Sequence, residues 1–117
     1  MSEPAPVLGL IRDLFFRSKL DAIAAQLGVE ITYASSLEIA SQRLRDSAPA
    51  TVFVDLSDEA FPAAEAVETI KAAAPNTRVI GFASHVDMKA LRGARDAGFS
   101  LTLSRSEFTV RLPELLK

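Results

Sequence analysis

The sequence predicts an α/β fold, in which a parallel five-stranded sheet with helices on both faces forms a (βα)5 three-layer sandwich. Short apolar runs alternate five times with segments of helical periodicity. The helical segments are roughly 10–15 residues long, the length of a right-handed crossover between parallel strands. Three runs, at 7–11, 51–54 and 79–83, are apolar almost throughout, as in strands that are covered on both faces.

Length and composition indicate one folded domain. The chain has 117 residues, of which 49% are hydrophobic and 24% are charged, a balance that excludes a disordered tail. We expect residues 1–6, with two prolines, to form a flexible leader, and residues 7–117 to form a single domain.

The first unit pairs a strand over 7–11 with a helix that ends at Gly28, a residue typical of helix C-termini. Its inner face carries Phe16, Leu20, Ile23, Ala24 and Leu27. In the second unit, residues 29–33 alternate as a strand does, and Ser35 with Glu38 forms a capping box that opens a helix to about Arg45. The inner face of that helix carries Leu37, Ala40 and Leu44.

The third and fourth units follow the same pattern. The strand at 51–55 precedes a helix over 61–74, whose inner stripe is Ala63, Val67, Ile70 and Ala74. The strand at 78–83 precedes a helix over 87–97 that closes at Gly98. Its inward residues are Leu91 and Ala94.

The fifth unit completes the sheet. It consists of a short strand over 100–103 and a helix over 108–116 that Pro113 interrupts. The strands at 29–33 and 100–103 are more polar than the others, which favours edge positions. We therefore predict the strand order 2-1-3-4-5, the flavodoxin-like arrangement.

Composition excludes several classes of function. The chain has no cysteine, so thiolate catalysis and cysteine zinc sites are ruled out. A net charge of −2 gives no basic surface for nucleic acid. No apolar run reaches the roughly 18–20 residues of a membrane span, and the start lacks a signal peptide. We expect a cytoplasmic protein that binds neither nucleic acid nor membrane.

Asp55 is the most informative polar residue. It closes a central buried strand, where ligands bind in sheets of this kind. A carboxylate there suits a nucleophile or a metal ligand. The alternative is that it caps a loop or pairs with an arginine.

At this point the chain resembles the receiver domain of two-component response regulators. The resemblance rests on the five β-α units, on Val-Phe-Val-Asp55, on Val-Ile-Gly-Phe-Ala-Ser84 and on Gly98 before the last strand. It implies that Asp55 is at the phosphoacceptor position and that Ser84 contacts the phosphoryl group. The phosphoryl-contacting lysine of receivers is replaced by Arg105, whose guanidinium is a planar fork rather than a point charge.

Other positions depart from the receiver pattern. The two acids that bind Mg²⁺ after the first strand fall on Ile11 and Arg12. Asp13 lies one residue late, and either joins Asp55 as a metal ligand or caps the first helix. Thr102 stands at the position of the aromatic switch residue.

The charges at this site indicate how it would work. Asp13 and Asp55 oppose Arg12 and Arg105, so the four charges sum to zero and leave little to attract Mg²⁺. We therefore expect no cofactor, or only weakly bound Mg²⁺. Our hypothesis is that Arg12 or Arg105 pairs with Asp55 and takes the place of the metal.

These observations predict a stand-alone receiver-like domain that is not an enzyme and acts through protein contacts without phosphorylation. The implied partners are a histidine kinase or a signalling complex, and the resemblance places docking or homodimerisation on residues 87–116. Three alternatives stay open. One is a working receiver phosphorylated on Asp55, and another is a small flavodoxin-like protein that binds a ligand in the same crevice. The third is a purely structural interaction domain in which Asp55 has no functional role.

Overall fold

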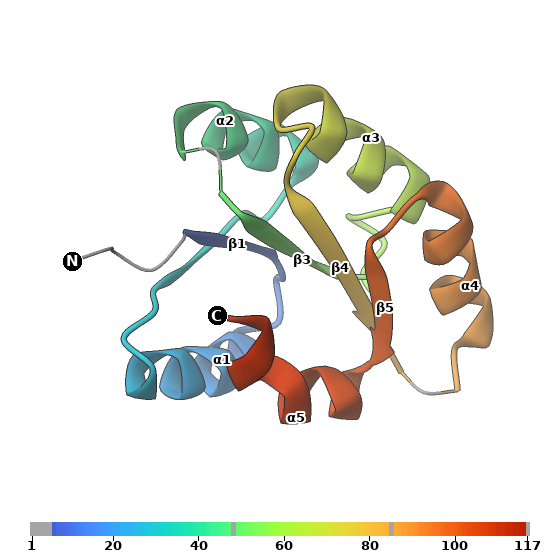
Figure 1. Cartoon of the computed structure of the whole chain (residues 1–117). Coiled ribbons are helices and arrows are strands. Elements are labelled where there is room, and N and C mark those ends of the chain that lie inside the picture. Colours follow the sequence, from blue (N-terminus) through green and yellow to red (C-terminus); the bar gives the residue numbers. More distant parts are fainter. Residues whose placement is uncertain (1–5, 48, 85, 117) are drawn as a thin grey trace.

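Five parallel strands form one sheet in the order β2-β1-β3-β4-β5, which confirms the predicted topology (Figure 1). The computed structural model describes residues 6–47, 49–84 and 86–116, so the expected leader, apart from Pro6, lies outside the described residues. The strands are β1 (Val7–Leu10), β2 (Ile31–Tyr33), β3 (Thr51–Asp55), β4 (Arg78–Ala83) and β5 (Leu101–Ser104). The two short strands predicted as edges, β2 and β5, are at the edges.

Helices cover both faces of the sheet (Figure 1). They are α1 (Leu14–Gln26), α2 (Leu37–Ser47), α3 (Ala63–Ala73), α4 (Met88–Ala97) and α5 (Arg105–Leu115). The helices α1 and α5 contact each other on one face, and α2, α3 and α4 pack in sequence on the other. Within the described ranges, no helix has both the length and the apolar character that crossing a membrane requires.

Each face of the sheet has its own buried core, and the central strands contribute to both. In β3, Val52 and Val54 belong to the core under α2, α3 and α4, whereas Phe53 belongs to the core under α1 and α5. The second core contains an aromatic cluster, which we define as Phe16, Phe53, Phe82 and Phe108. The rings of Phe82 and Phe108 stack with centroids 4.5 Å apart, and Phe53 meets Phe108 edge-on at 4.8 Å.

Two predicted helix starts were wrong because the capping residues differ from those expected. The N-terminus of α2 is capped by Ser36 and not Ser35, since the Ser36 hydroxyl accepts a hydrogen bond from the Ile39 N–H at 3.1 Å. The last helix begins directly after β5, not at Phe108, because the Ser104 hydroxyl caps it by accepting from the Glu107 N–H at 3.2 Å. That helix continues through Pro113 to Leu115, so the predicted interruption does not occur.

Smaller differences concern element bounds and one inward position. Phe61 precedes α3 and is fully buried in the loop. Leu91 in α4 is half-buried and belongs to neither core, whereas Ala94 is buried as predicted. Both Gly28 and Gly98 have positive φ, which is the conformation that the helix ends at these positions require.

Candidate functional site

A polar crevice lies at the carboxyl ends of β1, β3 and β5. Asp55, the last residue of β3, is buried there with 4% of its surface exposed. Its Oδ1 accepts a hydrogen bond from the Ser57 N–H at 3.0 Å. The crevice has a volume of about 430 Å³ and is lined by Arg12, Asp55, Ser57, Asp58, Glu59 and Arg105.

Arg105 joins two of the carboxylates. Its Nη2 lies 3.4 Å from Asp55 Oδ2, and its Nη1 lies 3.5 Å from Asp13 Oδ2. The guanidinium is held between aromatic rings, 4.7 Å from the centroid of Phe16 and 5.6 Å from that of Phe82. Contact with the ring faces is favourable for a cation, so the two rings help to fix the guanidinium beside Asp55.

Asp13 is the N-cap of α1. Its Oδ1 accepts from the N–H groups of Phe15 and Phe16 at 3.0 and 3.1 Å. Its other oxygen faces Arg105. Asp13 therefore has the geometry of the cap that we weighed against a metal ligand.

Arg12 pairs with Asp58 and not with Asp55. Its Nε and Nη2 donate to the two Asp58 oxygens, both at 2.6 Å, in a bidentate pair. Asp58 Oδ1 also accepts from the Ala60 N–H at 2.9 Å, which holds the loop after β3 in a turn. Of the two arginines in our hypothesis, Arg105 is thus the one that lies against Asp55.

The environments of Asp55 and Asp58 shift their pKa values in opposite directions. Burial raises the pKa of the Asp55 carboxyl, and it outweighs the Ser57 N–H and the charge of Arg105, which both lower it. For Asp58, the hydrogen bonds from the Arg12 guanidinium lower the pKa, and burial opposes them only partly.

This arrangement bears on whether the crevice suits Mg²⁺. Every oxygen of the Asp13, Asp55 and Asp58 carboxylates faces an N–H donor or a guanidinium. Mg²⁺ prefers near-octahedral oxygen ligands, and the guanidinium of Arg105 already lies between two of these carboxylates. In the part of the chain that the structure describes, no group of three or more histidine, cysteine or acidic side chains is placed to hold a metal ion. These residues fit the ion poorly.

Counting Asp58 changes the charge of the site. The sequence-based sum of zero took Asp13 and Asp55 against the two arginines. Adding Asp58, which pairs with Arg12, and Glu59, which lines the crevice, gives four carboxylates against two guanidiniums, or −2. Of the four carboxylates, Asp13, Asp55 and Asp58 face an arginine.

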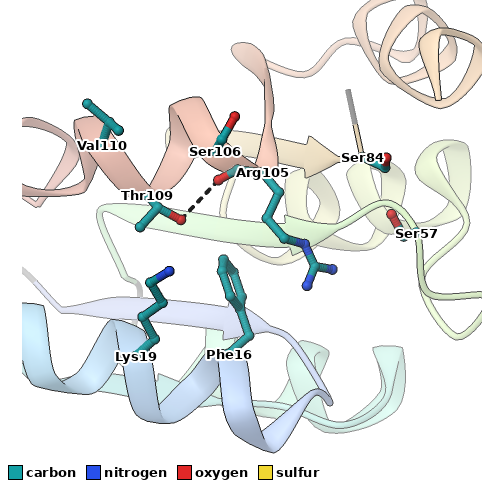
Figure 2. A pocket seen from close by; sticks show the side chains of 8 residues that line it. All are labelled: Phe16, Lys19, Ser57, Ser84, Arg105, Ser106, Thr109 and Val110. Carbon is teal, nitrogen blue, oxygen red and sulfur yellow. Dashed lines mark hydrogen bonds between the residues drawn. The ribbon is translucent and has the colours of Figure 1, made fainter. Parts of the chain in front are cut away.

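Ser84 and Thr102 lie around the crevice rather than in it. Ser84 follows β4, is exposed, and lines a neighbouring groove together with Arg105 and Ser57 (Figure 2). Thr102 is half-buried on β5 and pairs in register with Gly81. On that face of the sheet the ring of Phe99 covers Gly81, so an aromatic residue three positions earlier lies near the predicted switch position.

Sequence reasoning did not find two contributors to this site. The direction of the Asp58 side chain could not be derived from the sequence, because loop conformation decides it. Sequence reasoning also missed Phe16 as the ring beneath Arg105, because spacing alone marks Phe16 only as a core residue. The sequence signal for Asp58 was the residue type itself, because Asp side chains commonly accept from the backbone N–H two residues on. Asp58 does so from Ala60.

Comparisons with known proteins identify the fold. No protein-family model matches the sequence, and no curated protein gives a significant match. Among solved structures, a response regulator from Thermotoga maritima matches with a TM-score of 0.79 and 17% identity, covering 97% of this chain and 98% of that one. The receiver domain of a sensor histidine kinase from Pseudomonas aeruginosa, with a magnesium ion coordinated in its active site cleft, matches with a TM-score of 0.80 and 15% identity, covering 97% and 94%.

A third match is a response regulator from Burkholderia pseudomallei with a phosphorylated aspartic acid, a calcium ion and citrate. It has a TM-score of 0.77 and 14% identity, and the match covers 97% of this chain but 66% of that one. These likenesses confirm the flavodoxin-like fold and the resemblance to receiver domains. The roles of individual residues in this chain are a separate question.

Proposed function

We propose that this chain is a receiver-like signal-transduction domain that acts through protein contacts and does not depend on phosphorylation of Asp55. It has no catalytic activity of its own in this proposal, and it works in the cytoplasm with a histidine kinase or a larger signalling complex as its partner. The fold supports the general class, because the similar solved structures are receiver domains and response regulators.

The observation that carries the finer proposal is the position of Arg105. Its guanidinium faces both Asp55 and Asp13, and so occupies the place where a cation would balance these two charges. Mg²⁺ supplies the main charge stabilisation in phosphoryl transfer, and without it Asp55 is a weak phosphoacceptor. The bidentate Arg12–Asp58 pair further fixes the loop after β3. The crevice would then stay in one state.

Partner binding is proposed for residues 87–116, the region that receivers use for docking and dimerisation. Here this region includes α4, β5 and α5, with Met88 and Val110 as exposed apolar side chains. A crevice held in one state implies that this surface is presented constantly rather than switched on.

The test is an amide NMR titration of the protein with Mg²⁺ and then with beryllofluoride, a phosphoryl mimic. We expect no saturable shifts from either addition in a well-folded sample. Shifts centred on Asp55 and Ser84 that spread to residues 87–116 would instead identify a working phosphoacceptor and contradict the proposal.

A pair of variants tests the role of the internal charges directly. Arg12→Asp removes the partner of Asp58 and adds a carboxylate, so we expect it to gain Mg²⁺ affinity. Arg45→Asp makes the same charge change on the exposed side of α2 and should gain none. If Arg12→Asp binds Mg²⁺ no better than Arg45→Asp, the Arg12–Asp58 pair does not keep Mg²⁺ out of the crevice.

A further inference from the structure

The outer face of α1 carries apolar side chains where a solvated helix carries polar ones. Phe15 is 91% exposed and Leu14 is 70% exposed, and these two large side chains are adjacent in the first turn. Ser18, Ala22 and Ala25 continue the exposed surface along the helix. In α2, by contrast, every exposed residue is polar or charged. One exposed apolar residue is ordinary, but two large ones in a single turn indicate a surface that a partner covers.

The spacing of these residues fits a helix as the partner. Phe15, Ser18, Ala22 and Ala25 are separated by three, four and three residues, so they form one stripe along α1. Two helices that pack side by side share a seam with this spacing. The small side chains allow the backbone of a second helix to come close. Because the sheet and α5 lie on other sides of α1, the stripe is open to the outside (Figure 1).

Two opposite charges flank the stripe, one on each side. Figure 2 shows Lys19 on the side of α1 that faces α5. Asp21 is on the other side, where it accepts a hydrogen bond at 2.8 Å from the hydroxyl of Tyr33 in the edge strand β2. Among the described residues, neither Lys19 nor Asp21 belongs to an ion pair. The outer surface of α1 therefore has a positive and a negative flank.

These flanks are complementary to those of a second copy of this chain. If two α1 helices pack in parallel about a twofold axis that runs along them, the positive flank of each helix meets the negative flank of the other. Lys19 of each copy then faces Asp21 of the other, and Phe15 of each packs beside Leu14 of the other. An antiparallel pair would place Lys19 against Lys19 and Asp21 against Asp21, so the charges favour the parallel pair. Such a contact is the same on both copies and closes at two.

We propose that this chain forms a parallel homodimer through the outer face of α1. The inference stands apart from the proposed function, because it uses neither the residues that line the Asp55 crevice nor residues 87–116. A helix of 13 residues is about 20 Å long, which is short for an interface of the roughly 1,200–2,000 Å² that stable complexes bury. The dimer is therefore weak, with a Kd of about 0.1–1 mM.

Amide NMR spectra and relaxation rates over about 0.05–2 mM protein test the proposal, a range that spans the expected Kd. We expect shifts in α1 that depend on concentration, together with slower tumbling at high concentration. Phe15→Glu should weaken the dimer at least about tenfold, because it places a charge in the seam. Val86→Glu is the matched control, since Val86 is 75% exposed beside α4 on the other face of the sheet, and it should leave the association unchanged.

Charge variants test the parallel arrangement. Lys19→Glu should weaken the dimer by about fivefold, whereas Lys89→Glu, the same change on α4, should have no effect. Mixing Lys19→Glu protein with Asp21→Lys protein should restore the affinity, because each flank then meets an opposite charge. Asp21→Lys also loses the hydrogen bond from Tyr33, so its amide spectrum is first checked for the native fold.

Several results would overturn the proposal. One is a protein whose spectra and tumbling stay constant up to about 2 mM. Another is an association that Val86→Glu or Lys89→Glu weakens as much as the α1 variants do, since the second copy would then dock on α4. An association that Lys19→Glu leaves unchanged, or that the mixture of charge variants does not restore, would contradict the parallel pairing of the two helices.

Discussion

Asp55 and Asp58 are three residues apart in one loop region, yet the fold affects their carboxyl groups in opposite ways. Asp55 is buried, so water cannot solvate its charged form, and its pKa is raised. Asp58 receives two hydrogen bonds from Arg12, which stabilise the charged form and lower its pKa. The first carboxylate opposes folding at neutral pH, and the second supports it.

These shifts predict opposite pH dependences for two isosteric variants. Because the native pKa of Asp55 is raised, its carboxyl group lowers the stability of the protein as pH rises through that pKa. Asp55→Asn should therefore increase the free energy of unfolding at pH 7. The gain should disappear as pH falls toward about 4, the ordinary carboxyl value. Asp58→Asn should decrease the free energy of unfolding at pH 7, with a loss that shrinks as pH falls through the lowered native pKa.

Urea unfolding of the wild type and both variants across this pH range provides the measurement. Each variant replaces one carboxylate oxygen by an amide nitrogen, so the two serve as controls for each other. If both variants change the free energy of unfolding equally and with the same sign, loss of an ion pair, and not relief of burial, determines the effect of Asp55→Asn.

At the scale of elements, β4 is shaped by a glycine that faces a covered side of the sheet. A Cβ added to Gly81 would lie 2.7 Å from Leu56 Cδ1 and 2.9 Å from the Phe99 ring. Leu56 directly follows Asp55, and its N–H donates to the Phe82 carbonyl oxygen at 2.9 Å. The close approach of β4, Leu56 and the Phe99 ring thus depends on the absence of a side chain at Gly81.

Gly81→Ala should therefore destabilise the fold by about 1–3 kcal/mol, the usual cost of overpacking a well-packed core. Gly93→Ala is the matched control, since Gly93 is in the exposed surface of α4 and an added Cβ meets nothing within 4 Å. Alanine favours helix, so this control should gain about 0.5–1 kcal/mol. Both free energies come from urea unfolding, and a neutral Gly81→Ala would mean that Leu56 and Phe99 move aside freely.

The elements also show what sequence could and could not predict. The strand order follows from apolar runs and crossover lengths, and these depend on short-range patterns. Ser36 was missed because two adjacent serines leave the first turn ambiguous. Ser104 was missed although Ser104 and Glu107 have the spacing of a capping box, because the sequence analysis did not use that signal. At the site, the position of Asp55 followed from the strand pattern. The pairing of Arg12 with Asp58 did not, because it joins residues 46 positions apart through loop geometry.

For the whole molecule, the two cores are joined by strands that contribute to both. Because Val52, Phe53 and Val54 alternate between the cores, loss of packing on one face should destabilise the other face as well. Phe108→Ala removes the centre of the aromatic cluster and should cost about 3–5 kcal/mol. Ile70→Ala in the opposite core should cost about 2–5 kcal/mol.

Native-state hydrogen exchange tests whether these losses are shared across the sheet. In a single cooperative unit, Phe108→Ala should lower the exchange free energy of slow amides in α3 as much as that of amides in β3, although α3 lies on the far face. Ile70→Ala should do the same for α5. If protection falls only on the mutated face, the two layers of the protein unfold separately. Because α4 and α5 lie on opposite faces of the sheet, a partner bound at α4, β5 and α5 would contact both layers, and cooperative unfolding would spread its stabilisation over the whole domain.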